Sequence, residues 1–425
     1  MDTHSLAQGV SAAVFAVALL HTFAASQFER LSRRFPRHAG LFHLLGEVEV
    51  VFGFWAIVLI ALLALLQGGT EALAYAESRN YTEPLFVFVV MVVAASRPIL
   101  DAVTRTVAAL ARGLPVAQPV AMAWLGLSVV PLLGSLITEP AAMTLAALLL
   151  APVAFHGGIP ERAKYLALGA LLVNVSIGGT LTAYAAPPVL MVASTWQWDS
   201  AFMFTHFGWK AALAVAANAT LAAWTLRPHL LRHDDRPAGP QDAPDMPPAV
   251  PALVSAVHIA LLAGVVLFAH HPVAFLGMFL LFLGFTQAYA RYQNPLILKE
   301  ALLVGFFLAG LVVLGGLQRW WLQPIVSSLE PLALFFGALG LTAVTDNAAL
   351  TYLGSLIAGI SPQSQYMLVA GAVAGGGLTV IANAPNPAGV ALLKPGFADG
   401  TVGAGGLLLG ALVPTAVAAA AFLAL

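Results

Sequence analysis

Long apolar runs follow one another along the chain, and each is about as long as a membrane is thick. A helix needs roughly 20 mostly apolar residues to cross a bilayer, and lipid offers the backbone no other hydrogen-bond partners. Ten runs are expected to cross as helices: 6–26, 42–66, 83–103, 165–196, 205–226, 251–270, 272–290, 296–316, 364–394 and 402–423. The pattern therefore predicts an all-α polytopic membrane protein.

The order of elements in the first part of the chain is repeated in the second part. Each part has three apolar runs, a proline-broken stretch, a run interrupted by glycine and proline, and a final plain run. The broken stretches, 117–156 and 322–360, are expected to be re-entrant hairpins, which leaves about five crossings in each part. An odd number of crossings turns the second part upside down, so 1–226 and 251–425 are predicted to form an inverted repeat. The polar, proline-rich residues 227–250 are interpreted as the linker between the two repeats.

The basic residues test this layout independently. If the N-terminus lies outside, 14 of the 18 Lys and Arg residues fall in loops on one side of the membrane. They are Arg30, Arg33, Arg34, Arg37, Arg105, Arg112, Arg162, Lys164, Arg227, Arg232, Arg236, Arg291, Lys299 and Lys394. The positive-inside rule makes that side the cytoplasm, so the linker is expected there and both termini outside. We expect an integral protein of a bacterial inner (plasma) membrane.

Composition narrows the classes of function. The chain is 60% hydrophobic and 9% charged, whereas an ordinary soluble domain has about 25% charged residues. The net charge of −1 gives no reason to expect nucleic-acid binding, and the absence of cysteine excludes disulfides and thiolate metal ligands. No HExxH motif occurs, and no spacing suggests a Ser-His-Asp set. We therefore expect neither an enzyme nor a cofactor.

Two heptapeptides in the broken stretches match each other. Residues 138–144 read TEPAAMT and residues 345–351 read TDNAALT, with an acid, Glu139 or Asp346, at the second position. An ionisable residue at membrane depth is a functional candidate by default, although each acid could instead cap the helix that follows. The candidate ion- or proton-binding residues of the two tips are Thr138, Glu139, Thr345, Asp346 and Asn347.

A second pair of motifs follows the first pair in the same order. Residues 178–182 read GGTLT and residues 375–379 read GGGLT, and each is followed by a proline-containing break. Glycine costs about 1 kcal/mol and proline about 3 kcal/mol inside a helix, so each helix is expected to unwind within the membrane. Freed carbonyls and hydroxyls there would suit a hard cation such as Na⁺, although the glycines could simply allow close helix packing. The candidate donors are the side chains of Thr180, Thr182, Thr379 and Asn383 and the backbone at Gly178, Gly179, Gly375 and Gly376.

Other charges in the apolar runs have simpler interpretations. Glu47 and Glu49 lie near the start of the second run, where they could reach the interface or pair with nearby arginines. Arg97 and Asp101 are four residues apart and are predicted to form an ion pair within one helix. If the tip acids do not form the ion site, the two glutamates are the next candidates.

The motifs resemble those of the ion transporter superfamily. That group includes NhaD-type Na⁺/H⁺ antiporters, arsenite efflux proteins and Na⁺-coupled dicarboxylate carriers, and this chain is most similar to a family of Na⁺/H⁺ antiporters within it. TDNAAL resembles the Asp-Asn hairpin tip of the antiporter branch, whereas the carboxylate carriers have Ser-Asn-Thr at both tips. The first tip differs from the family pattern, with Glu139-Pro140 where an Asn is common. The resemblance implies a homodimer with a scaffold part and a moving transport part.

Four functions are compared, and cation/proton exchange by alternating access fits the residues best. Two buried carboxylates could hold Na⁺ in one state and protons in another, with Na⁺ expected at Asp346, Asn347 and Glu139. A Na⁺-coupled carriage of carboxylates or other anions on the same fold is the alternative, but it would need a cationic or hydroxyl-rich pocket. Arg97 is the one intramembrane arginine candidate for that pocket. A membrane enzyme is not supported, because the sequence carries no catalytic motif. A channel is not favoured either, because it does not need an unwound helix in each half.

Overall fold

The computed structural model describes residues 3–231 and 248–425, which fold into helices and connecting loops without a strand in these two ranges. The helices of the first half are α1 (Thr3–Phe23), α2 (Ala25–Arg34), α3 (Ala39–Gly46), α4 (Val48–Gln67), α5 (Gly69–Glu77), α6 (Thr82–Ala94), α7 (Arg97–Gly113), α8 (Gln118–Leu127), α9 (Val129–Ile137), α10 (Glu139–Ala154), α11 (Glu161–Gly178), α12 (Pro187–Trp196), α13 (Ser200–Met203) and α14 (Trp209–Leu230). The helices of the second half are α15 (Ala252–Leu267), α16 (Pro272–Ala288), α17 (Leu298–Gly315), α18 (Arg319–Ser327), α19 (Pro331–Thr342), α20 (Asn347–Ser355), α21 (Pro362–Gly375), α22 (Asn386–Leu393) and α23 (Ala404–Ala424). Residues 232–247 of the predicted linker lie outside the described ranges.

Short helical turns connect several of these helices. They are η1 (Pro36–His38), η2 (Gly179–Leu181), the π-helical turn η3 (Phe204–Gly208), η4 (Ala290–Tyr292), η5 (Val380–Ala382), η6 (Lys394–Gly396) and η7 (Ala398–Gly400). Two of them, η2 and η5, lie in the two predicted interruptions, directly after α11 and shortly after α21.

Several helices are long and apolar enough to cross a membrane. Among the described residues, five helices meet this test by length and composition, or up to seven if each of two bent pairs counts as one span. The five are α1, α4, α11, α17 and α23, and the bent pairs are α6 with α7 and α8 with α9. The ten crossings therefore stay a prediction, since α10, α15, α16 and α19 are apolar but shorter.

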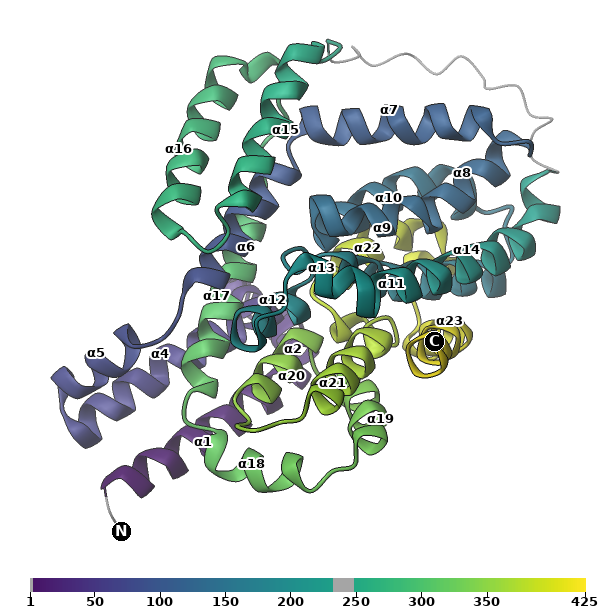
Figure 1. The fold of residues 1–425 in the computed structure, drawn as a ribbon. Helices are drawn as coiled ribbons and strands as arrows, with labels where there is room; N and C mark the ends of the chain where they lie inside the picture. The colour runs from purple at the N-terminus through teal and green to yellow at the C-terminus, as the bar shows by residue number, and fades with distance from the viewer. Residues whose placement is uncertain (1–2, 232–247) are drawn as a thin grey trace.

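The third expected span, 83–103, is not one straight helix. α6 ends at Ala94, and α7 begins at Arg97 after a bend of 63°. Pro98 explains the break, because its ring nitrogen cannot donate to the carbonyl of Ala94 as a continuous helix requires. In Figure 1, α7 consequently runs across the molecule beside α8.

The two predicted hairpins lie next to the two interrupted helices. The first hairpin pairs α9 with α10 around Thr138, and the second consists of α19 and α20 around residues 343–346. The helix α11 stops at Gly178 and the chain resumes as α12, and α21 stops at Gly375 before α22. Both interruptions thus occur where glycine and proline predicted them.

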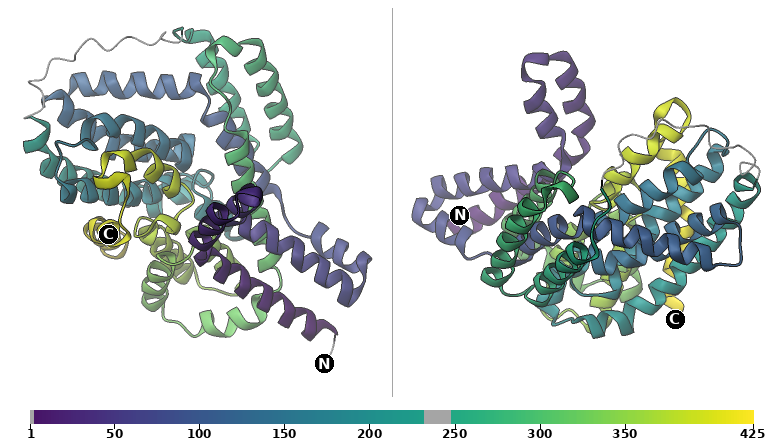
Figure 2. Two further views of the ribbon diagram at one scale, coloured as in Figure 1. Left: turned by 180° about the vertical axis from the view of Figure 1, so that it is seen from behind. Right: turned by 90° about the horizontal axis from the view of Figure 1, so that it is seen from above.

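Near the centre of the molecule, a helix of each half packs against the hairpin of the other half. The helix after the first interruption, α12, packs on α20 of the second hairpin, whereas α22 packs on α10 of the first hairpin. Each hairpin is thereby covered by a helix of the other half. Figures 1 and 2 show α1, α4 and α5 at one end of the molecule and α14 and α23 toward the opposite end.

Candidate functional site

Glu139 occupies the point where the first hairpin meets both interruptions. It is the first residue of α10 and its side chain is fully buried. Asn383, in the second interruption, donates a hydrogen bond from Nδ2 to Glu139 Oε2 at 2.9 Å. On the other side, a Cβ added to Gly179 would lie 2.5 Å from Glu139 Oε1. The carboxylate is therefore held between residues from both halves of the chain.

The residue before Glu139 has an unusual backbone. Thr138 has a φ of +78° and a ψ of 150°, although it carries a β-branched side chain. Such a conformation costs of the order of 1–3 kcal/mol and persists only where its surroundings enforce it. The strained residue turns the chain sharply from α9 into α10, and that turn places the following carboxyl group in the buried centre.

Asp346 caps the helix of the second hairpin. Its Oδ1 accepts hydrogen bonds from the backbone N–H groups of Ala348 at 2.8 Å and Ala349 at 3.1 Å. The capping role that the sequence left open is therefore present. The carboxylate also lines a small cavity of about 30 Å³ together with Asn383 and Glu49. Asp346 and the asparagine that binds Glu139 thus line the same cavity.

Asn347 lies where the two interrupted helices cross. It is fully buried, and its Nδ2 lies 3.4 Å from Ser176 Oγ, to which it donates. Ser176 in turn donates to the carbonyl of Val373 at 2.8 Å, which ties α11 to α21. A Cβ added to Gly376 would overlap Ser176 Oγ and approach Asn347 Nδ2 to 3.0 Å. The glycine therefore permits the crossing of the two helices.

The predicted threonines fasten backbone segments. Thr182 donates to the carbonyl of Ser135 at 2.7 Å, and Thr379 donates to the carbonyl of Ala343 at 2.8 Å. These equivalent bonds attach each interruption to the hairpin of its own half. Thr180 and Thr345 donate to carbonyls about one turn earlier in the chain, those of Ile177 near the end of α11 and Leu341 near the end of α19. A ligand role for the four hydroxyls stays a prediction.

Gly178 and Gly375 allow the interrupted helices to touch hairpin backbone. A Cβ on Gly178 would lie 2.7 Å from the Pro131 carbonyl oxygen, and one on Gly375 would lie 2.5 Å from that of Leu339. Close packing, the simpler interpretation of these glycines, is therefore real. It is also what brings the interruptions to the hairpin tips.

Several polar residues of this centre were not among the predicted ones. Ser135 donates to the Gly178 carbonyl at 2.7 Å and accepts from the Leu181 N–H at 2.9 Å. Asn386 donates to the carbonyls of Gly376 and Thr379, which closes the second interruption. Asn386 belongs to the same NAPNP segment as Asn383, and that shared segment was a usable signal.

The centre is rich in buried oxygen atoms that accept no hydrogen bond from the described residues. They are Glu139 Oε1, Asn383 Oδ1, Asn347 Oδ1, Asn386 Oδ1, Thr138 Oγ1 and Thr342 Oγ1. Buried polar atoms usually have partners, so such a group of acceptors calls for an explanation. Carboxylate, amide and hydroxyl oxygens are the donors that hard cations take. In the described part of the chain, no three His, Cys, Asp or Glu residues converge as a metal site would require.

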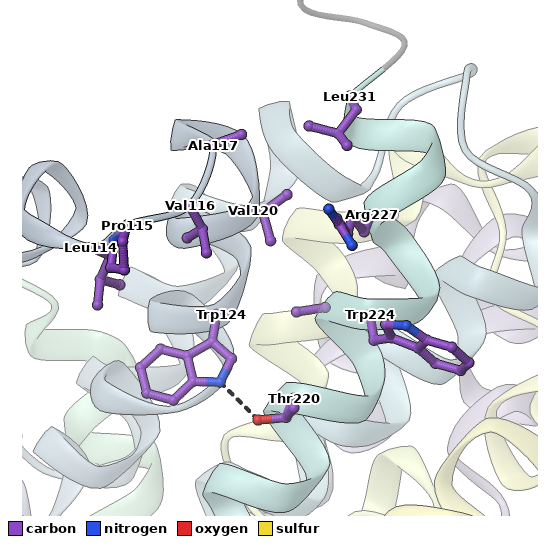
Figure 3. Close-up of a pocket in the computed structure, with 11 residues that line it drawn as sticks. Leu114, Pro115, Val116, Ala117, Val120, Trp124, Thr220, Trp224, Arg227 and Leu231 are labelled. Carbon is purple, nitrogen blue, oxygen red and sulfur yellow. Dashed lines mark hydrogen bonds between the residues drawn. The ribbon is translucent and has the colours of Figure 1, made fainter.

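A larger groove lies elsewhere and contains none of these residues. Figure 3 shows this groove of about 640 Å³ between α8 and α14, where Trp124 donates to Thr220 at 3.0 Å. Its walls are mainly apolar, with Arg227 at one end, and no acid lines it among the described residues. The groove is therefore not the candidate ion site.

Comparison with known proteins identifies the family. Residues 7–425 match the family described as “Putative Na+/H+ antiporter”. The chain belongs to this antiporter family. Among solved structures, it is similar to the Alcanivorax borkumensis YdaH transporter, with 16% identity and a TM-score of 0.45 over 88% of this chain and 96% of that chain. No curated protein matches the chain.

Family membership decides the class of function. Together with the apolar helices, it makes the chain an integral membrane transporter rather than an enzyme. The expected likeness to NhaD-type antiporters and arsenite efflux proteins stays a prediction, as do the homodimer, the inverted repeat, the re-entrant path of the hairpins and the particular membrane.

Proposed function

We propose that the protein exchanges Na⁺ for H⁺ across the membrane by alternating access, with Glu139 and Asp346 as the acids that bind both. The proposal rests on one observation above the others. Glu139 is fully buried, one of its oxygens accepts from Asn383 of the other half, and the other oxygen has no partner among the described residues.

The chemistry of exchange follows from the cost of burying a charge. An ionised carboxylate in a water-poor interior is strongly unfavourable unless a cation or a proton compensates it. Glu139 would therefore hold either Na⁺ or H⁺ in each conformation. Neighbouring amide oxygens, such as Asn383 Oδ1 and Asn347 Oδ1, would complete the coordination of Na⁺ but contribute little to a proton. Competition for one site, combined with access from alternate sides, is sufficient for antiport.

Two cavities border the two interruptions, and we take them as the routes of access in this scheme. One, of about 570 Å³, is lined by Ala183 and Tyr184 of the first interruption and by Glu83. Another, of about 370 Å³, is lined by Ala384 and Pro385 of the second interruption. The predicted topology assigns the first cavity to the outside and the second to the cytoplasm.

The carriage of an anion is less well supported. Arg97, the predicted anion ligand, donates from Nη2 to the Pro248 carbonyl at 2.8 Å, and its Nε lies 3.7 Å from Asp101. The small cavity beside Asp346 is lined by acidic, amide and apolar residues, with no basic side chain among the described residues that line it. These surroundings favour a cation over a carboxylate substrate.

The test is proton movement in proteoliposomes that contain the purified protein and a pH-sensitive dye. Na⁺, Li⁺, K⁺, arsenite and succinate are added in turn to the wild type and to the Asp346→Asn and Glu139→Gln variants. We expect Na⁺-dependent proton efflux in the wild type and its loss in both variants, with the protein still inserted. Exchange at the wild-type rate in both variants would place the ion site elsewhere, and a response to succinate alone would support the anion carrier.

A further inference from the structure

Glu49 stands where two cavities meet. It lies in the first turn of α4 and lines the small cavity of about 30 Å³ that also contains Asp346 and Asn383. It lines the larger cavity of about 370 Å³ as well, together with Lys299 and Glu300. Since Lys299 is 69% exposed, this second cavity reaches the protein surface. Glu49 is therefore the carboxyl group between the surface and the two central side chains.

The small cavity is mostly apolar, but three of its lining residues, Glu49, Asp346 and Asn383, carry side-chain oxygens of the kind that bind a cation. A cavity needs about 10–15 Å³ to hold a water molecule, so about 30 Å³ accommodates a small ion but not a dicarboxylate. Asn383 is 1% exposed, and its Oδ1 has no partner among the described residues. The carboxyl groups of Glu49 and Asp346 supply further oxygens from two other elements of the fold, α4 and the second hairpin. This unpartnered oxygen indicates a ligand independently of the acids.

The neighbouring acid, Glu47, differs from Glu49 in its surroundings. Glu47 Oε1 lies 3.6 Å from Lys299 Nζ, so a basic side chain already compensates its charge. Within the described residues, no basic side chain pairs with Glu49. Beyond the exposed Glu300 at the surface, a cation that enters through the larger cavity would thus meet its next uncompensated carboxylate at Glu49.

We propose that Glu49 is a third cation-handling residue, at which a small monovalent cation leaves the larger cavity and from which it passes to Asp346 and Asn383. The inference rests on the proposed cation/proton exchange and adds the route to its site. It assigns a function to α4, whose Glu49 the sequence offered only as an alternative to the acids of the hairpin tips. The N-terminal helices then take part in ion entry as well as in support.

Kinetics of reconstituted full-length protein test the proposal. Glu49→Gln should raise the KM for Na⁺ about tenfold, equivalent to about 1.4 kcal/mol, and leave the maximal rate within about twofold. Glu49→Asp should restore part of the affinity. The control, Glu300→Gln, removes an exposed acid of the larger cavity that does not line the small one, and should leave the KM unchanged. A wild-type KM in Glu49→Gln would overturn the role of Glu49, whereas absence of Na⁺-dependent exchange in the wild type would overturn the proposed function.

A labelling experiment covers the case in which Glu49→Gln fails to insert. The chain has no native cysteine, so Thr144→Cys places a single thiol in the lining of the larger cavity. A positively charged thiol reagent should modify this cysteine faster than a negatively charged reagent of the same size. Equal rates, or a faster reaction of the anionic reagent, would contradict a cation route that ends at Glu49.

Discussion

Replacement of Asn383 by alanine tests the contact between the two halves at the proposed site. The substitution removes the Nδ2 donor that lies 2.9 Å from Glu139 Oε2 and leaves that carboxylate oxygen without its one described partner. A hydrogen bond to a charged group contributes about 1.5–3 kcal/mol net, against about 0.5–1.5 kcal/mol for a bond between neutral groups. The loss is therefore larger when Na⁺ is bound to the ionised acid than when a proton neutralises it.

The difference between these two hydrogen-bond energies sets the expected change in the KM for Na⁺. About 1–1.5 kcal/mol corresponds to a five- to tenfold rise of the KM for Na⁺, roughly, at constant pH, and loss of the Asn383 oxygen as a ligand would add to it. The assay is Na⁺-dependent proton efflux from proteoliposomes over a range of Na⁺ concentrations. Thermal unfolding in detergent, measured in parallel, separates loss of the site from loss of the fold.

Asn218 provides the matched control. It is as deeply buried as Asn383, at 1% exposure, but its amide donates to Asn174 and to the Pro414 carbonyl rather than to an acid. Asn218→Ala should lower the unfolding temperature without changing the KM for Na⁺. If Asn383→Ala shows a wild-type KM, or if both variants raise the KM equally, the reasoning about Glu139 and Asn383 is refuted.

Three further substitutions follow from the same centre. Gly376→Ala should lower stability by about 1–3 kcal/mol, because the added methyl group overlaps Ser176. Adding Ser176→Gly to that variant should recover most of the loss. A double variant that melts at the same temperature as Gly376→Ala would disprove the clash. Asp346→Asn should unfold at nearly the wild-type temperature, because Asn caps a helix about as well as Asp. Asp346→Ala should lose about 1 kcal/mol of stability. Equal unfolding temperatures of the two variants would show that the cap does not contribute to stability. Thr138→Gly should raise the unfolding temperature by relieving the positive φ, by about 1 kcal/mol in free energy, and unchanged or lower stability would mean that the threonine side chain compensates its strain.

The interruptions were predictable because their cause is local. Glycine and proline destabilise a helix wherever they occur, so the ends of α11 and α21 could be placed from the sequence. The bend between α6 and α7 has an equally local cause in Pro98, but its apolar surroundings made the run resemble one span. Overall hydrophobicity outweighed a single proline in that interpretation.

The partner of Glu139 could not be read from the sequence. Asn383 is 244 positions away, and no local pattern specifies which interruption faces which hairpin. The directions of the threonine hydroxyls were equally hidden, since Thr182 and Thr379 point to hairpin carbonyls that only the folded chain brings near. The repeated motifs identified the elements of the site, and the packing between the halves determined the contacts within it.

The packing of α12 and α22 against hairpins of the opposite halves has a consequence for how the protein is made. At about 5–20 residues per second, a ribosome needs roughly 12–50 s to add the 244 positions that separate Glu139 from Asn383. During that interval the first hairpin lacks α22, and Glu139 has no hydrogen bond from Asn383. The newly made first half is therefore expected to stay incompletely packed at the translocon until the second half is inserted. A gene cut within the linker would yield two polypeptides that mature only by finding each other.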